Sequence, residues 1–423
     1  MIALVALLSA AAAPHTFYVR AGALFDGTGD AIRQNIVLQI EGDRIRAVGV
    51  PIPAGAQVVD LSGYTVLPGL IDVHVHLESR ADHFEDIWTF RTSSPQGAMV
   101  AVVHARRTLE AGFTTVRDVG SDPFVAVDLR GLIEEGYFPG PRVVASGPCI
   151  SITGGHCDLN NYPPTVRVSL FPAERDFAVA DGVDQIRHVV RAHLQHGVDV
   201  VKIAASGGVF SRGDTPGAPQ LSLEEMRVAV EEAHKGGRKV AAHAHGTQSI
   251  KDALRAGVDS IEHGTLIDEE GIRLLKERGA YLVGDLYNDD YILGKADELH
   301  IPKEYVDKER AIGQLQRENW GKAIRAGVKA AFGTDAGVYP HGDNAKQFAV
   351  YVRFGMTPAQ AIRTATSDAA VLLGREKDVG TLQPGRFADL IAVRGNPLQD
   401  VRVLENMTLV MKGGAIVKDA RGK

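Results

Sequence analysis

The feature that most constrains the fold is a junction that recurs along the middle of the chain. A helical segment ends at glycine and an apolar strand follows at once, at Ala111-Gly112-Phe113, His196-Gly197-Val198, Ala256-Gly257-Val258 and Ala326-Gly327-Val328. Glycine just after a helix can adopt the left-handed conformation that ends it. Helices that alternate with short apolar strands indicate parallel β–α units.

Eight strands of this kind are predicted, at Leu67–His76, Thr114–Asp118, Arg142–Ala145, Val198–Ala204, Lys239–His243, Ser260–His263, Tyr281–Gly284 and Lys329–Asp335. Eight parallel strands close a TIM barrel, so the sequence predicts an α/β fold with a (β/α)8 barrel over residues 67–375. A doubly wound open sheet is the alternative. It is disfavoured because no GxGxxG motif follows the first strand.

Both ends of the chain contain short strands separated by glycine instead of helices. Such strands are predicted within residues 16–66 and again within 378–419, where one covers Leu404–Met411. Neither end has enough apolar residues to fold alone. We therefore expect residues 14–66 and 376–423 to pair into one small β-sandwich domain beside the barrel.

Charge and the N-terminus bear on partners and location. A net charge of -6 without a basic run argues against a nucleic-acid partner. Residues 1–13, MIALVALLSAAAA, resemble a cleaved secretory signal and are too short to span a bilayer. We therefore predict a periplasmic or secreted protein with no membrane partner; without cleavage the chain would be cytoplasmic.

The two cysteines, Cys149 and Cys157, do not form a disulfide framework or a zinc-finger spacing. We expect them to be small buried or loop residues, and a single local disulfide between them is the alternative.

Polar residues occur where the predicted strands end, which is the face of a barrel where active sites form. These residues are His74, His76, Lys202, His243, His245, Glu262, His263 and Asp335. Alternation along a strand places His74 and His76 on the same side. One such ending is weak evidence, whereas five endings on one face are hard to explain by packing.

Neutral imidazoles and carboxylates are the ligands of catalytic zinc sites, where the metal lowers the pKa of bound water to about 7. A buried lysine beside two cations would lose its proton. Its neutral amine can then take up carbon dioxide and form a carbamate whose two oxygens bridge two metals. This chemistry explains a lysine at Lys202; an ion-paired or partly solvated lysine is the alternative.

These residues resemble the amidohydrolase superfamily. The resemblance rests on Pro68-Gly-Leu-Ile-Asp72-Val-His74-Val-His76, Lys202, His243, Ile261-Glu-His263-Gly, Gly333-Thr-Asp335 and the C-terminal Val379-Gly-Thr-Leu-Gln-Pro-Gly-Arg-Phe-Ala-Asp389-Leu. Within the superfamily the chain is most similar to the branch of imidazolonepropionase-like and Xaa-Pro dipeptidase-like enzymes, including the ochratoxinases, which release phenylalanine from ochratoxin A.

The resemblance implies two zinc ions and six ligands: His74, His76, Lys202, His243, His263 and Asp335. Carboxylated Lys202 would bridge the metals, and Asp335 would act first as general base and then as general acid. His243 is chosen over His245 because the first histidine of this segment is the ligand in the family.

Four residues are candidates for substrate contacts. In the Thr153-Gly-Gly-His156 loop, His156 matches a family histidine that polarises the scissile carbonyl, although Cys157 stands where a glycine is expected. Arg212 is a candidate for holding a substrate carboxylate, with a surface arginine as the alternative. His245 faces the site beside His243. Tyr287 is a candidate pocket wall, with plain packing as the alternative.

The leading hypothesis is a binuclear zinc amidohydrolase acting on N-acyl amino acids or dipeptides with a free carboxylate, in the manner of a carboxypeptidase or prolidase. Ochratoxin A is one candidate substrate, and a homo-oligomer is expected. A mononuclear deaminase or cyclic-amide hydrolase is the first alternative. It is disfavoured because deaminases of this fold place a Glu shortly after the strand-five histidine, where this chain has Gln248. An inactive barrel scaffold is the second alternative.

Overall fold

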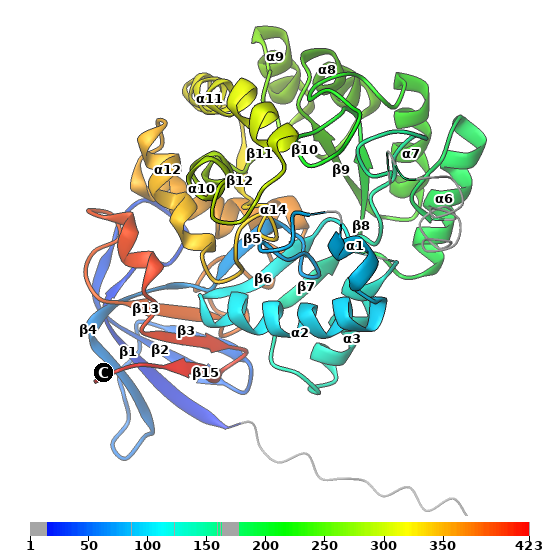
Figure 1. Cartoon of the computed structure of the whole chain (residues 1–423). Coiled ribbons are helices and arrows are strands. Elements are labelled where there is room, and N and C mark those ends of the chain that lie inside the picture. Colours follow the sequence, from blue (N-terminus) through cyan, green and yellow to red (C-terminus); the bar gives the residue numbers. More distant parts are fainter. Residues whose placement is uncertain are drawn as a thin grey trace, which may run out of the picture.

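A computed structural model describes residues 15–422 of the chain, apart from 86, 122, 159, 161 and 163–176. Eight short parallel strands lie at its centre, surrounded by helices (Figure 1). The strands are β5 (Leu70–Val75), β6 (Phe113–Asp118), β7 (Arg142–Ala145), β8 (Val200–Ala204), β9 (Lys239–Ala244), β10 (Ser260–His263), β11 (Tyr281–Gly284) and β12 (Ala330–Phe332). All eight coincide with predicted strands, so the predicted (β/α)8 barrel is confirmed.

The barrel consists of two hydrogen-bonded arcs. One arc has the order β12-β11-β10-β9-β8 and the other β5-β6-β7. Single parallel bridges close the two seams, Val75 with Ala336 and Ile150 with Ile203. The first bridge joins the residue between His74 and His76 to the residue after Asp335, so the barrel closes where the predicted site residues are.

Helices follow the strands and cover the outside of the barrel. They are α1 (Ile87–Arg91), α2 (Ser94–Glu110), α3 (Val125–Glu134), α6 (Val183–Gln195), α7 (Leu223–Lys235), α8 (Thr247–Ala256), α9 (Glu269–Arg278), α10 (Tyr287–Lys295), α11 (Lys303–Arg325), α12 (Gln347–Arg353), α13 (Pro358–Thr364) and α14 (Ser367–Leu373). At the four predicted junctions, Gly112, Gly197, Gly257 and Gly327 have φ of 95°, 80°, 100° and 77°. A side chain would be strained there, which explains why glycine separates helix from strand.

The chain ends form a small β domain, as predicted. Its seven strands are β1 (Thr16–Leu24), β2 (Arg33–Glu41), β3 (Arg44–Val48), β4 (Val58–Pro68), β13 (Leu390–Val393), β14 (Leu409–Lys412) and β15 (Ala415–Asp419). They form one sheet in the order β15-β14-β13-β4-β1-β2-β3. An antiparallel bridge from Arg44 to Phe387 brings the β3 edge back toward β13, so the sheet wraps around a single apolar core.

One predicted strand of this domain is wrong in part. Leu404–Met411 does not form one strand: Val401–Glu405 is a 3-10 helix, and β14 begins only at Leu409. The carboxylate of Asp400 accepts a hydrogen bond from the Arg402 amide at 3.0 Å and fixes this turn. Within the described part of the chain, none of the helices combines the length and apolar character that crossing a bilayer requires.

Candidate metal centre and active site

The structure brings the six predicted metal ligands together at one end of the barrel. They are His74 in β5, His76 just after it, Lys202 in β8, His243 in β9, His263 at the end of β10 and Asp335 just after β12. All six line one cavity of about 680 Å³. Residues far apart in the sequence therefore meet because each follows or ends a neighbouring strand.

His74, His76 and Asp335 form the first group of possible ligands. The Nδ1 of His74 donates to Glu262 Oε2 at 2.9 Å, and the Nδ1 of His76 donates to the Gly120 carbonyl at 3.1 Å. When the rings are neutral their Nε2 atoms therefore carry lone pairs, and these atoms lie 3.4 and 3.2 Å from Asp335 Oδ1. Two lone pairs that face a carboxylate oxygen need a cation between them, so this group fits a metal ion.

His243, His245 and His263 form a second group of possible ligands. Their ring centroids lie 4.5 to 4.7 Å apart. Burial, together with the neighbouring histidines, lowers the pKa of His243 and His245 well below the ordinary value. Their rings are therefore neutral at pH 7, which is the form of imidazole that binds metals. The geometry alone does not separate His243 from His245 as a ligand.

Two buried nitrogens at this centre, Lys202 Nζ and His243 Nε2, have no hydrogen-bond partner among the described residues. His263 Nδ1 also makes no well-aligned hydrogen bond, although Asp285 Oδ2 lies 3.0 Å from it. A buried polar atom without a partner is costly, so orphaned atoms that cluster at one point call for a missing group. Lys202 is 3% exposed. Metal ions would satisfy the two imidazoles, and a carbamate on the lysine would satisfy Nζ.

Backbone strain occurs at two of these residues. His263 and Asp335 have φ of 68° and 57°, in the left-handed region that residues with a side chain rarely adopt. Strain of this kind persists where the surroundings hold it in place and is common at functional sites. Here it turns both side chains toward the cavity at the point where their strands end.

Several residues that support the centre received no predicted role. Glu262 holds His74 and accepts a second hydrogen bond from the buried Arg117 at 2.7 Å. Asp285, which follows β11, has its Oδ2 3.0 Å from His263 Nδ1 and forms a third group of possible ligands with His263 and Asp335. Asp285 could have been predicted as a site residue, because it directly follows the predicted strand Tyr281–Gly284.

His156 is held above the centre by a chain of hydrogen bonds. Its ring stacks on His243 at 4.0 Å, and its Nδ1 lies 2.8 Å from Ser211 Oγ. Ser211 donates to Asp214 at 2.6 Å, and Lys308 donates to the same carboxylate at 2.9 Å. Because the serine proton goes to Asp214, Nδ1 of His156 is the donor to Ser211, and Nε2 is left for the cavity.

Burial lowers the pKa of His156 to about 4, against the opposing charge of Asp214. The ring is therefore neutral at pH 7 in the free protein. Negative charge that develops on a carbonyl oxygen beside it would favour a second proton on the ring. Asp214, acting through Ser211, stabilises that charged form. The arrangement suits a donor that becomes strongest as the reaction proceeds.

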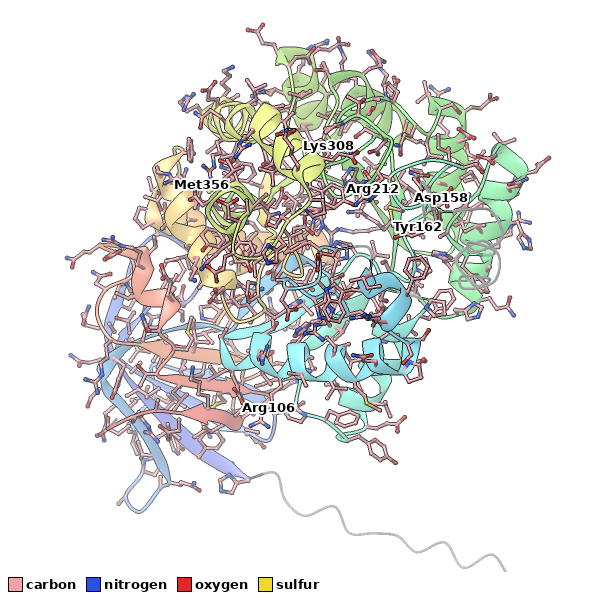
Figure 2. All side chains as sticks on the ribbon, in the orientation of Figure 1. Arg106, Asp158, Tyr162, Arg212, Lys308 and Met356 are labelled. Atoms are coloured by element: carbon pink, nitrogen blue, oxygen red, sulfur yellow. The ribbon has the colours of Figure 1, made fainter. Side chains whose placement is uncertain are left out.

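The other two predicted substrate contacts differ in position. Arg212 lines the cavity, 3.7 Å from Glu304 and 5.7 Å from the Tyr305 ring centre. Tyr162 and Asp158, which Figure 2 also labels, line the same cavity. Tyr287 is absent from the described residues that line this cavity. Its ring packs against Tyr339 at 4.9 Å and borders a separate depression, so it does not wall the pocket.

Aromatic side chains gather at the mouth of the cavity: Phe84, Trp88, Tyr162, Phe210 and Tyr305. Phe210 stacks on Phe84 at 5.4 Å and meets Tyr305 edge-on at 5.2 Å. A cavity of this size fits a small molecule, and aromatic side chains together with a few convergent polar groups are typical of such sites.

A barrel with histidines, carboxylates and a buried lysine at the C-terminal ends of its strands defines the class of metal-dependent hydrolases. The chain belongs to the amidohydrolase family, which matches residues 65–417. It is a hydrolase that acts on amide bonds.

Three comparisons place the chain within this family. Ochratoxinase from Aspergillus niger is 34% identical over 421 residues, which cover 95% of this chain and 86% of the relative. The structure of a Xaa-Pro dipeptidase with methionine bound in its active site has a TM-score of 0.89 and 36% identity, covering 95% of this chain and 99% of that one. A prolidase complexed with N-methylphosphonate-L-proline has a TM-score of 0.87 and 31% identity, covering 96% and 100%. The predicted resemblance to the dipeptidase-like branch is confirmed.

Proposed function

We propose that this protein is a binuclear zinc amidohydrolase that cleaves the amide bond of N-acyl amino acids or dipeptides. His74, His76 and Asp335 would hold one zinc, His243 and His263 the other, and carboxylated Lys202 would bridge the two. The observation that carries the proposal is the buried Lys202 Nζ, which has no partner among the described residues although it lies within a cluster of possible ligands.

Two zinc ions bound there would polarise the scissile carbonyl and make water a better nucleophile. Asp335 then takes a proton from the attacking water and passes it to the leaving amine. Its Oδ2 accepts a hydrogen bond from Asn288 at 3.2 Å, which orients the carboxylate. The ring of His156, supported by Ser211, would bind the carbonyl oxygen as charge develops on it.

The substrate class follows from the cavity. Its aromatic mouth suits an apolar or aromatic acyl group or side chain, and Arg212 is placed at the cavity where it would hold the carboxylate of the amino-acid half. Ochratoxin A, an amide of phenylalanine, and Xaa-Pro or other dipeptides are therefore the first candidates. The names of an ochratoxinase and of two dipeptidase-like relatives support the same choice.

Two measurements test this proposal. Metal analysis of the purified chain should give close to two zinc ions per chain; one ion would favour the mononuclear alternative. A panel of N-acyl amino acids, Xaa-Pro and other dipeptides, and ochratoxin A should release free amino acid from at least one class. If the zinc-loaded enzyme released amine from none of these compounds, the proposal would be refuted.

Location and assembly stay predictions. The predicted signal, residues 1–13, lies outside the described residues. We propose export to the periplasm or beyond, and N-terminal sequencing of the native protein would test cleavage. We also propose a homo-oligomer, which the mass of the purified protein in solution would check.

A further inference from the structure

The two cysteines of the chain lie at opposite ends of the loop that carries His156. Cys149 comes just after β7, and its neighbour Ile150 is part of the barrel wall. The Ile150 amide donates to the Lys202 carbonyl at 2.9 Å, and its carbonyl accepts from the Ala204 amide at 2.8 Å. Cys149 is therefore anchored to the rigid side of the centre.

Cys157 directly follows His156 and belongs to the loop instead of the wall. The loop folds back on itself: the Cys157 amide donates to Ser151 Oγ at 3.4 Å, and the His156 amide donates to Gln220 Oε1 at 2.9 Å. This fold brings the cysteines together, and their side chains lie close enough to interact with each other. Both side chains line the active-site cavity, where a small oxidant can reach them.

We propose that Cys149 and Cys157 form a reversible disulfide that ties the His156 loop to the barrel wall. A low-molecular-weight disulfide such as oxidised glutathione supplies the oxidant. The first thiolate attacks it, releases one glutathione and forms a mixed disulfide; the second cysteine displaces the other glutathione. Two cysteine thiols are oxidised to one disulfide, and one glutathione disulfide is reduced to two thiols.

Bond formation changes the position of His156. The two sulfurs, which are not bonded in this structure, must approach to about 2.05 Å, with a fixed torsion about the bond. Because Cys149 is held in the wall, Cys157 has to move, and His156 moves with it. His156 then shifts relative to His243, on which it stacks at 4.0 Å. None of the six proposed metal ligands lies within the closed segment 149–157, so the metals stay bound.

The experiment uses the full-length, zinc-loaded protein, treated in parallel with oxidised and with reduced glutathione. The chain has only 2 cysteines, so thiol titration reports the bond directly. After oxidation we expect no free thiols in the monomeric chain and one linked peptide pair containing Cys149 and Cys157. Two thiols that remain free, a stable glutathione adduct or a bond between chains would overturn the proposal.

Activity tests the consequence, and this arm rests on the proposed amidase function. We expect oxidation to lower kcat at least tenfold, with unchanged zinc content and full recovery in dithiothreitol. The double variant C149S/C157S should have the same kcat after treatment with oxidised and with reduced glutathione, because it has no thiol to form the bond or to hold a glutathione adduct. A disulfide that forms without changing kcat would overturn its role as a switch. A protein inactive on every amide would leave the peptide mapping valid, so failure of the two proposals can be distinguished.

Discussion

The Nδ1 of His74 lies 2.9 Å from Oε2 of Glu262, and the pair is fully buried. The other oxygen of Glu262 accepts from Arg117 at 2.7 Å. Burial alone would raise the pKa of Glu262, but Arg117 and His74 lower it, so the carboxylate stays charged. This carboxylate fixes the tautomer of His74 and leaves its Nε2 free for a metal ion.

Glu262→Gln should weaken zinc binding about 10- to 100-fold, as is typical when the partner of a metal-binding histidine is lost. Chelator competition would measure the affinity. Glu270→Gln, at a surface carboxylate on α9, is the matched control. Equal zinc affinity in the two variants would contradict a supporting role for Glu262.

Lys202→Ala should abolish activity and lower the zinc content, because no other described side chain at this centre can supply a bridging carbamate. Lys235→Ala, at an exposed lysine of α7, should leave both unchanged. Reconstitution of the metal-free wild-type chain should also be slower in buffer stripped of carbon dioxide. Full activity of the Lys202 variant would refute the bridge.

His156→Asn should lower kcat about 100-fold, because one donor to a developing oxyanion contributes roughly 3 kcal/mol. Ser211→Ala should lower kcat less, since it breaks only the link from His156 to Asp214. Zinc content should stay at the wild-type level in both variants. His188→Asn, at an exposed position of α6, controls for loss of a histidine. Loss of zinc together with activity would instead indicate a structural role for His156.

The barrel and the convergence of its polar strand ends could be predicted because their signals are local, whereas the choice of six ligands among these residues came from the family resemblance. The spacing of His74 and His76 sets which way they point, and glycine with positive φ marks junctions such as Gly257. Each ligand ends or follows a strand, and the closed barrel brings these ends together. No knowledge of packing was needed for either inference.

The partners of those ligands could not be predicted, because they depend on contacts between distant segments. Glu262 is 188 residues from His74, and Lys308 is 97 residues from Ser211. The sequence predicts that Glu262 lies at the end of a strand, but it does not show which histidine this carboxylate contacts. The choice between pocket wall and plain packing for Tyr287 also depended on such a contact, since its ring packs against Tyr339 and is not among the described residues that line the cavity.

Glu309 on α11 gives a prediction about pH. Its side chain is 5% exposed, lines the cavity, and has no hydrogen-bond or ion-pair partner in the part of the chain that the structure describes. Burial, with the charges of Asp289 and Asp285, raises its pKa to about 8 from 4.5. The folded protein therefore holds a proton on Glu309 at neutral pH, whereas the unfolded chain does not.

A carboxyl whose pKa is raised by folding favours the folded state less as pH rises. For Glu309 the loss of folding free energy begins at about pH 4.5, where the carboxyl ionises in the unfolded chain, and reaches its full value above about pH 8. Because a glutamine at position 309 cannot ionise, we expect the free energy of unfolding of Glu309→Gln to exceed that of the wild type increasingly between about pH 5 and 8. The excess is about 5 kcal/mol at most, at 1.36 kcal/mol for each pKa unit. Denaturant unfolding at several pH values would measure it. Glu318→Gln, at an exposed position on the same helix, is the control, and its free energy of unfolding relative to the wild type should not vary with pH. If the same difference for Glu309→Gln were also independent of pH, the buried carboxyl would already be ionised in the folded enzyme.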